Sequence, residues 1–240
     1  MTAQTHLWQE QPDLFEAQAV VISSTPGRVK LDVCIFYPSG GGQPGDIGEL
    51  ILEGGDSLRV VDAVKDEAGD SVLILENPDD QLAHDDQVLQ RLDIPRRQAH
   101  MRMHTALHLL SVVIPLPVTG GQIGAEKGRL DFDMPEAPED KDALEAQLNA
   151  LIARDLSVTE SWITDAEMAA NMDLVKTMSV RPPMGQGRVR LVRIGTGDDQ
   201  IDLQPCGGTH VRSTAEIGPV TLGKIEKKGK QNRRVSLLLA

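Results

Sequence analysis

The chain has 240 residues, 40% of them hydrophobic and 25% charged, which is the composition of a globular protein with one large domain or two ordinary ones. No stretch approaches about 18 consecutive apolar residues, so a membrane span is not expected, and the first residues lack the basic start and apolar core of a secretory signal. Because the chain has only two cysteines, we expect no disulfide framework and a cytoplasmic location.

The net charge of -12 is concentrated in the first part of the chain. Residues 1–90 carry 17 acidic and 4 basic side chains, for a net charge of -13, whereas residues 91–240 carry 19 and 20, for a net charge of +1. This asymmetry predicts two units with different partners, and it leaves the second unit free to bind a nucleic acid.

The first 92 residues are predicted to form a β domain. Short apolar or alternating runs recur, with turn signals such as Thr25-Pro26-Gly27 between them. The predicted strands are residues 17–23, 28–37, 48–52, 58–64, 72–76 and 87–92. Six short strands at this spacing are typical of a small barrel or sandwich. Cys34 lies in the second run and is predicted to be a buried core thiol.

A helical period begins at Ile94 and continues to Val113. Asp93 can cap its first turn, and the prolines at positions 115 and 117 end it. Beyond it we expect a strand pair at 118–124 and 128–132, helices at 140–156 and 165–172, a loop at 181–187, a hairpin of 188–194 with 200–203, and strands at 218–225 and 234–239. The predicted fold class is therefore α+β, with a β domain at 1–92 and a two-layer α+β domain at 93–240.

Four residues of the second domain have the spacing of metal ligands. His104 and His108 are four residues apart on the predicted helix, so both imidazoles lie on one face. Cys206 and His210 enclose Gly207 and Gly208, which let the backbone curl so that both side chains face one point. Three nitrogens and one sulfur suit Zn²⁺. By simple count, four ligands favour a closed structural site, whereas a catalytic site keeps a position for water, and the spacing leaves both open.

These motifs resemble the editing domain that alanyl-tRNA synthetases share with free-standing alanyl-tRNA editing proteins of the AlaX type. The segments that carry the resemblance are HMRMHTALHLLS (100–111), VTGGQIGAEKGRLDFDM (118–134), LQPCGGTHV (203–211) and GPVTLGKIEKKGKQNRR (218–234). In the first domain, FYPSGGGQPGDIG (36–48) resembles the glycine-rich segment in the N-terminal barrel of the longer members. The five motifs occur in the family's order and cover nearly the whole chain.

The resemblance implies an activity, a fold and a cofactor. The family hydrolyses the ester bond of a tRNA for alanine that carries a wrong amino acid, chiefly serine and in some members glycine. Its N-terminal barrel resembles a translation-protein β-barrel, and 240 residues leave no room for an aminoacylation domain beside the two units, so the free-standing form is expected. Its ion is zinc, and the matching ligands are His104, His108, Cys206 and His210. The threonyl-tRNA synthetase editing domain uses similar ligand pairs, but its other motifs match less well.

An editing site can select serine by requiring its hydroxyl, because alanine would leave fixed polar partners unpaired at about 1–3 kcal/mol each. The candidate partners are Thr105, Thr119, Gln122 and the zinc ion, and Gln204 is a further substrate-site candidate that can orient a ligand or a water. Gln122 resembles a substrate-side glutamine of the synthetase editing site. Two alternatives stay open: Thr105 can simply pack within its helix, and Gln204 can be an ordinary glutamine at a strand end.

The predicted partner is a mischarged tRNA for alanine, with no membrane and no protein partner. The candidate RNA contacts are Gly41, Gly42, Gln43, Arg96, Arg97, Lys227, Lys228, Lys230, Arg233 and Arg234. The basic residues could follow phosphates, and the glycines offer a close approach for the acceptor end. Alternatively, the glycine-rich segment is an ordinary barrel turn and the basic run is a solvated chain end. With only six aromatic residues in the chain, contacts to the RNA backbone are expected rather than base stacking.

Three functions are compatible with these residues. The first is a zinc-dependent deacylase of mischarged tRNA, the second a non-catalytic tRNA-binding module with a structural zinc, and the third a zinc hydrolase of small esters or amides. A deacylation assay combined with metal analysis separates them.

Overall fold

The computed structural model describes residues 4–176 and 187–240, and the chain divides into two compact units, residues 1–98 and 99–240. Among the described residues, no helix is long and apolar enough to cross a membrane. The predicted loop at 181–187 lies, except for residue 187, outside the described residues.

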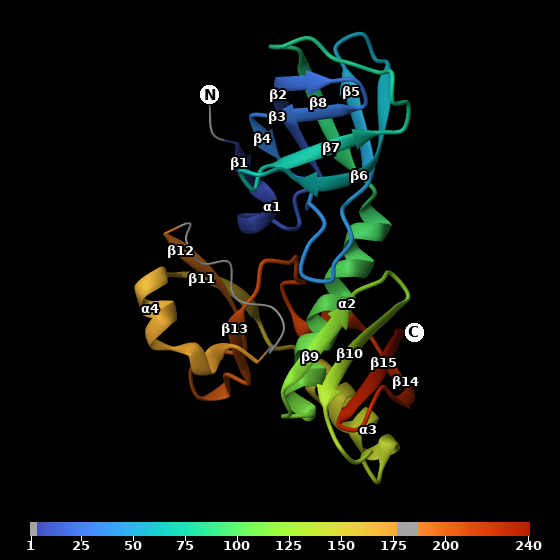
Figure 1. Cartoon of the computed structure of the whole chain (residues 1–240), viewed down its shortest axis with the longest axis vertical. Helices are drawn as coiled ribbons and strands as arrows, with labels where there is room; N and C mark the ends of the chain where they lie inside the picture. The colour runs from blue at the N-terminus through green and yellow to red at the C-terminus, as the bar shows by residue number, and fades with distance from the viewer. Residues whose placement is uncertain (1–3, 177–186) are drawn as a thin grey trace. The chain divides into compact units, whose positions relative to one another are not determined.

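The first unit is built around a closed six-stranded β-barrel (Figure 1). Its strands are β2 (Glu16–Thr25), β3 (Arg28–Leu31), β5 (Gly48–Leu52), β6 (Ser57–Lys65), β7 (Ser71–Leu75) and β8 (Gln87–Leu92). They pair antiparallel in the order β2-β3-β7-β6-β5-β8, and β8 closes the ring on β2. Five of the six predicted strands are confirmed, whereas the predicted strand 28–37 is divided into Arg28–Leu31, which belongs to the ring, and Val33–Cys34, which does not. Closure into a barrel leaves the ring without a free edge.

Successive side chains point to opposite faces of these strands, and the apolar ones that point inward fill the barrel. Val21, Leu31, Leu50 and Leu73 are all fully buried in one cluster together with Cys34. Burial raises the pKa of the Cys34 thiol to about 12, and the predicted core thiol is confirmed. Beside the ring, the short strands β1 (Thr5–His6) and β4 (Val33–Cys34) pair in parallel, and helix α1 (Leu7–Glu10) contacts β4.

The second unit contains most of a long helix and a four-stranded antiparallel sheet. Helix α2 runs from Ile94 to Val113, as predicted, and Asp93 Oδ1 accepts the Arg96 amide N–H at 3.0 Å as the predicted cap. The strands are β9 (Val118–Gln122), β10 (Lys127–Asp133), β14 (Val220–Lys227) and β15 (Asn232–Leu239), in the order β14-β15-β10-β9. Helix α3 (Lys141–Ala153) begins after its N-cap Asp140 and contacts β14.

One face of this sheet packs against α2. Met103 and Leu107 of α2 are buried in the same apolar cluster as Phe132 of β10 and Leu237 of β15. The approach is closest at Gly128 of β10, where an added Cβ would lie 2.5 Å from the Met103 sulfur. The helix that carries the two predicted histidine ligands is therefore held firmly on the sheet.

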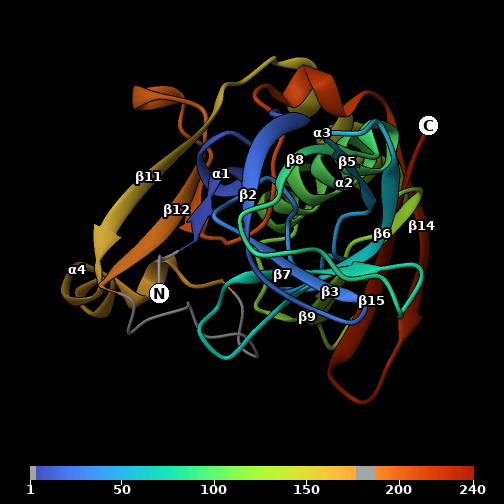
Figure 2. The same ribbon diagram turned by 90° about the horizontal axis from the view of Figure 1, so that it is seen from above.

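A separate three-stranded antiparallel sheet completes the unit (Figures 1 and 2). It consists of β11 (Val158–Thr164), β12 (Arg188–Ile194) and β13 (Asp202–Pro205), in that order. The other elements are α4 (Asp165–Ala170) and the 3-10 turns η1 (Met172–Leu174), η2 (Gly197–Asp199) and η3 (Thr214–Ile217). The predicted hairpin is confirmed with its second strand shifted by two residues, whereas β11 is not predicted, because its half-polar sequence becomes a strand by pairing with the distant β12. The α+β class is confirmed.

Candidate metal centre

Four side chains from two distant parts of the second unit converge on one point. His104 and His108 project from one face of α2, one turn apart, and Cys206 and His210 lie in the loop after β13. Their nitrogen and sulfur atoms all lie within 4.8 Å of one another. The imidazole centroids of His104 and His210 are 4.3 Å apart, and those of His108 and His210 are 4.7 Å apart. The structure therefore brings together the four residues predicted as ligands.

Two of the separations match the spacing of donors around one tetrahedral ion. Cys206 Sγ lies 3.4 Å from His104 Nε2 and 3.3 Å from His210 Nε2. With metal–ligand bonds of about 2.0–2.3 Å, tetrahedral geometry places two donor atoms roughly 3.3–3.8 Å apart. Imidazole nitrogen and thiolate sulfur are also donors that transition metals prefer. The residues present at this centre therefore fit a metal ion.

Hydrogen bonds fix how two of the rings face the centre. His108 Nδ1 donates to Asp202 Oδ2 at 3.0 Å, and His210 Nδ1 lies 3.1 Å from Thr105 Oγ1. Because both contacts use Nδ1, they leave Nε2 of each ring for the centre. His210 is fully buried, whereas Cys206 is only partly buried.

The electrostatics of the centre favour a thiolate. Burial by itself raises the pKa of Cys206, but the neighbouring imidazole of His104, through its charge and its hydrogen bond, outweighs it and holds that pKa well below its usual value. Burial lowers the pKa of His108, yet the hydrogen bonds with Asp202 and Cys206 outweigh it and raise that pKa to about 9. Burial and the neighbouring charge of His104 hold the pKa of His210 well below its usual range. A thiolate is the form in which a cysteine binds a metal.

A buried carboxylate that is not predicted from the sequence stands behind His108. Asp202 of β13 is 3% exposed and also accepts hydrogen bonds from Lys176 Nζ and, at 2.8 Å, from Gln204 Nε2. Burial raises the pKa of Asp202, but His108 and Lys176 together lower it to about 2. A signal was present in the sequence, because residues 202 and 204 alternate onto one face of the strand that leads to Cys206.

Arg190 of β12 holds the ligand loop, and it too is not predicted from the sequence. Its guanidinium donates to Gly208 O at 2.7 Å, to Cys206 O at 3.2 Å and to Glu160 Oε1 at 3.0 Å. Arg190 is 4% exposed, so these charge-assisted bonds are shielded from water. The expected glycine curl is not required at Gly207, whose φ is not left-handed and whose Cβ would meet no atom of the described residues within 4 Å.

Two of the predicted substrate-binding residues lie at the centre. Gln204 is 9% exposed, and its Nε2 lies 3.0 Å from His108 Nδ1. Thr105 is fully buried, and its hydroxyl donates to Met101 O at 2.9 Å besides contacting His210. The structure therefore does not support a direct substrate contact by Thr105, which orients a predicted ligand instead.

The other two lie on β9, and their hydrogen bonds run along the sheet. Thr119 Oγ1 donates to Asp131 O at 3.1 Å and accepts from Asn232 at 2.8 Å. Gln122 is exposed, and its Oε1 accepts from Arg129 Nε at 3.2 Å. No hydrogen bond among the described residues joins either side chain to the four converging donors.

Arg97 belongs to the interior of the first unit. It is fully buried, forms an ion pair with Asp46, and donates to Pro12 O at 2.7 Å and to Ile35 O at 2.6 Å. A guanidinium with no exposed surface and these partners does not reach a phosphate. The structure therefore does not support the predicted RNA contact of Arg97, because its charge is used to hold the barrel unit together.

The glycine-rich segment shows a similar division. Gln43 is 2% exposed, so the structure does not support an RNA contact by its side chain either. Gly41 and Gly42 are exposed, with left-handed φ values of +57° and +85°. Arg96 is half-buried. The exposed glycines thus form the tip of an ordered turn.

The predicted basic residues near the chain end divide into exposed lysines and engaged arginines. The exposed residues are Lys227, Lys228 and Lys230. Arg233 donates to Pro135 O at 2.7 Å, and Arg234 donates to both carboxylate oxygens of Asp131 at 2.8 and 2.9 Å. Lys228 also pairs with Glu226 at 2.8 Å, so Lys227 and Lys230 are the more available groups for an RNA backbone.

Comparison with known proteins identifies the family. Residues 189–236 match the threonyl and alanyl tRNA synthetase second additional domain. Over 232 residues the chain is 34% identical to the alanyl-tRNA editing protein AlaX-M of Methanosarcina barkeri, covering 93% of this chain and 94% of that protein. The chain belongs to the AlaX-M family of alanyl-tRNA editing proteins.

Two further relatives define how the family match extends. The AlaX-M protein of Saccharolobus solfataricus is 31% identical over 242 residues, covering 98% of each chain. The alanine–tRNA ligase of Caldivirga maquilingensis is 34% identical over 92% of this chain, but over only 25% of the ligase. The chain thus matches AlaX-M members along nearly their full length and the ligase along one part.

Proposed function

We propose that this AlaX-M family member is an aminoacyl-tRNA deacylase that hydrolyses tRNA for alanine mischarged with serine, and with glycine as a second substrate. The observation that carries the proposal is the convergence of His104, His108, Cys206 and His210 at one centre. The chain shares 34% identity with a protein named for alanyl-tRNA editing. The cytoplasm, where tRNA is charged and used, is the proposed location.

The ion of this proposal is Zn²⁺, because three imidazoles and a thiolate, with donor atoms within 4.8 Å of one another, are ligands that suit zinc. When bound, zinc would supply a Lewis acid that polarises an ester carbonyl or lowers the pKa of a water molecule. His104, His108, Cys206 and His210 would hold it, with Asp202 and Thr105 keeping two of the rings oriented.

The reaction requires mainly placement, because an aminoacyl ester is already reactive. Water adds to the carbonyl carbon of the aminoacyl group, and the bond from that carbon to the ribose oxygen of the terminal nucleotide breaks. The ribose oxygen takes up a proton, and the free amino acid and the uncharged tRNA separate. The protein's part is to hold the ester and the water at the centre.

Gln204 is the proposed group that recognises serine at the centre. Its Nε2 is bound to Asp202, whereas its Oε1 has no partner among the described residues and can accept from a serine hydroxyl. Alanine would leave that acceptor unpaired, which costs about 1–3 kcal/mol and favours serine accordingly. Thr119 and Gln122 stay predictions of substrate contact.

The two domains have separate roles in the proposal. Residues 93–240 form the two-layer editing domain, and residues 1–92 form a barrel of the translation-protein type whose exposed Gly41 and Gly42 approach the tRNA. The exposed lysines at 227, 228 and 230 contact phosphates, so that affinity falls as salt rises. Arg96, Arg233 and Arg234 stay predictions of RNA contact.

The test is incubation of the zinc-loaded protein with seryl-, glycyl- and alanyl-tRNA for alanine. We expect loss of the seryl ester and, more slowly, of the glycyl ester, with alanyl-tRNA at background. His104→Ala should abolish the activity, whereas the control His84→Ala, at an exposed histidine of the first unit, should not. Background rates for all three substrates would refute the proposal.

One observation favours a second function. Four protein donors suffice to complete a closed tetrahedral site, as in a tRNA-binding module with a structural zinc. That function predicts that Cys206→Ala unfolds the second unit and that the intact protein binds tRNA without turnover. Metal content, thermal unfolding and ester loss measured on one preparation separate the two functions.

A further inference from the structure

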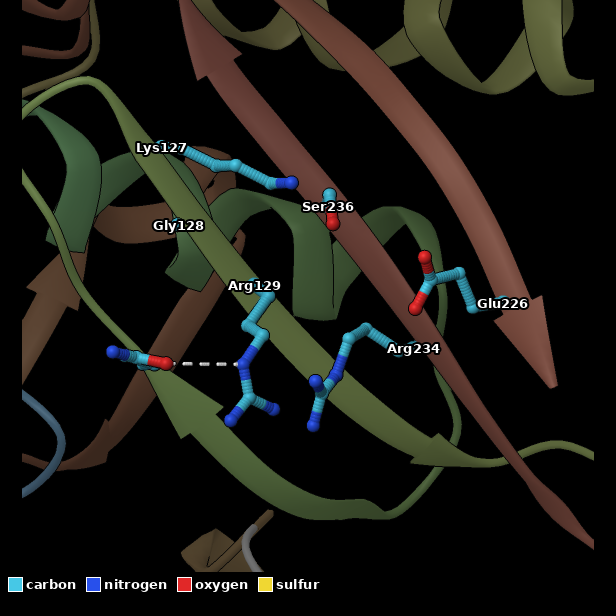
Figure 3. A pocket seen from close by; sticks show the side chains of 7 residues that line it. Lys127, Gly128, Arg129, Glu226, Arg234 and Ser236 are labelled. Carbon is cyan, nitrogen blue, oxygen red and sulfur yellow. Dashed lines mark hydrogen bonds between the residues drawn. The ribbon is translucent and has the colours of Figure 1, made fainter. Parts of the chain in front are cut away.

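The four-stranded sheet carries a pocket away from the metal centre (Figure 3). The pocket has a volume of about 330 Å³ and is lined by Gln122, Lys127, Arg129, Glu226, Arg234 and Ser236. Gly128, between Lys127 and Arg129, identifies the face, because its Cβ direction meets Met103 of α2. Since successive residues of a strand alternate, Lys127 and Arg129 point to the opposite face. This sheet-face pocket therefore lies on the side that α2 does not cover.

The sheet-face pocket has more hydrogen-bond donors than acceptors. Neither Lys127 Nζ nor Ser236 Oγ has a partner among the described residues, although Ser236 is only 4% exposed. Gln122 uses its Oε1 to accept from Arg129, and its amide NH₂ group has no partner within residues 4–176 and 187–240. Arg129 and Arg234 each keep one terminal NH₂ group beyond those bound to Asp131. A ligand that accepts several hydrogen bonds would complete the pocket.

The charge of this face indicates that the ligand is an anion. Both arginines pair with Asp131, and Glu226 pairs with Lys228 at 2.8 Å. Together with Lys127, these ion pairs comprise four positive and two negative side chains, in a chain whose net charge is -12. A local excess of positive charge in an acidic protein raises the concentration of anions at that face.

We propose that the sheet-face pocket binds a phosphodiester group of the tRNA backbone. The proposal rests on the proposed function, which makes tRNA the substrate. A phosphodiester carries one negative charge and oxygens that accept several hydrogen bonds, which matches the unpaired donors. The exposed lysines at 227, 228 and 230 follow Glu226 on the same hairpin and extend the positive surface along it, as a run of backbone phosphates requires. The pocket positions the tRNA and adds affinity without reading its bases.

The test compares tRNA binding by the full-length variants Lys127→Glu and Ser236→Ala. Lys141→Glu is the matched control, since Lys141 is exposed at the start of α3 and the charge change is the same. Fluorescence anisotropy over a range of salt concentrations gives the dissociation constant and its salt slope. Lys127→Glu should weaken binding on the order of tenfold and reduce the slope by about one, because one phosphate contact is lost. Ser236→Ala should weaken binding roughly two- to tenfold.

Deacylation kinetics provide the second readout. For Lys127→Glu we expect KM for seryl-tRNA to rise by about the factor seen in binding, with kcat at saturation retained, because the pocket does not touch the ester. Thermal unfolding should match that of the wild type, since Lys127 is exposed and forms no ion pair with any residue that the structure describes.

Each outcome decides between the hypotheses. If both variants bind tRNA with the affinity and salt slope of the wild type, the proposed phosphodiester site is refuted, whereas the proposed deacylase function is unaffected. If the wild type binds tRNA through the pocket but hydrolyses no aminoacyl-tRNA, the proposed function fails and the pocket stands. If inorganic phosphate displaces tRNA when both are present at the same concentration, the pocket is a site for small anions, and the proposal would also be overturned.

Discussion

Replacing Asp202 by asparagine should weaken metal binding while leaving the fold intact. Asparagine keeps the shape of the side chain and an oxygen for His108 Nδ1–H, but it removes a negative charge from a site that is 3% exposed. Loss of a carboxylate behind a metal-binding histidine costs about 10- to 100-fold in metal affinity, or about 1.4–2.7 kcal/mol. Lys176 also loses its ion pair, but because its side chain is 31% exposed, folding stability should fall by about 1 kcal/mol or less.

The assay is competition for Zn²⁺ with a chromophoric chelator. Asp198→Asn is the control, because Asp198 lies exposed in the connection between β12 and β13 and carries the same charge. An unchanged zinc dissociation constant for Asp202→Asn would refute the reasoning that Asp202 acts through His108. Loss of secondary structure in the metal-free variant would assign Asp202 to folding instead.

Three further predictions concern stability. Arg97→Ala leaves the carboxylate of Asp46, 1% exposed, without its ion pair and should lower the free energy of unfolding in urea by about 3–5 kcal/mol; a change below about 1 kcal/mol would contradict the buried pair. Burial raises the pKa of Asp131, but Arg234 and Arg129 outweigh it and hold that pKa below its usual value. The ionised carboxylate of Asp131 therefore stabilises the folded protein at neutral pH, and this contribution disappears as the pH falls below about 4. The midpoint of thermal unfolding of Asp131→Asn should therefore lie below that of the wild type at pH 7 and approach it in acid. A difference in midpoint that stays constant with pH would argue against a link between the ionisation of Asp131 and stability. Gly128→Ala places a Cβ 2.5 Å from the Met103 sulfur and should cost about 1–3 kcal/mol in thermal unfolding, whereas Gly54→Ala, in open space, should be within about 0.5 kcal/mol of the wild type.

Local features predict most of the elements of this chain. The helix over Ile94–Val113 is bounded by its Asp93 cap and by the prolines that follow, and the six barrel strands are bounded by turn residues. Caps, periodicity and turn residues act over a few positions, so they can be read directly from the sequence. Strand β11 cannot be predicted in this way, because it becomes a strand by pairing with β12 and not by local preference.

The donors of the metal centre are predictable for a related reason. Closely spaced pairs of histidine and cysteine serve few purposes besides metal binding. The pairs His104 with His108 and Cys206 with His210 are therefore recognisable from their chemistry and spacing alone. Their convergence is a tertiary fact, since 102 positions separate Cys206 from His104.

The amino-acid sequence by itself determined most of the elements that form, which residues are able to bind a metal and which family motifs the chain carries. Only the tertiary structure decided the roles of the ordinary charged residues. Neighbouring arginines at 96 and 97 look alike in the sequence, yet Arg97 is buried against Asp46, 51 positions away. Asp202 looks like any other acidic residue of a predicted strand, yet it orients the imidazole of His108, which is 94 positions away. Burial and pairing depend on partners that the chain brings together by folding, and no local pattern encodes them.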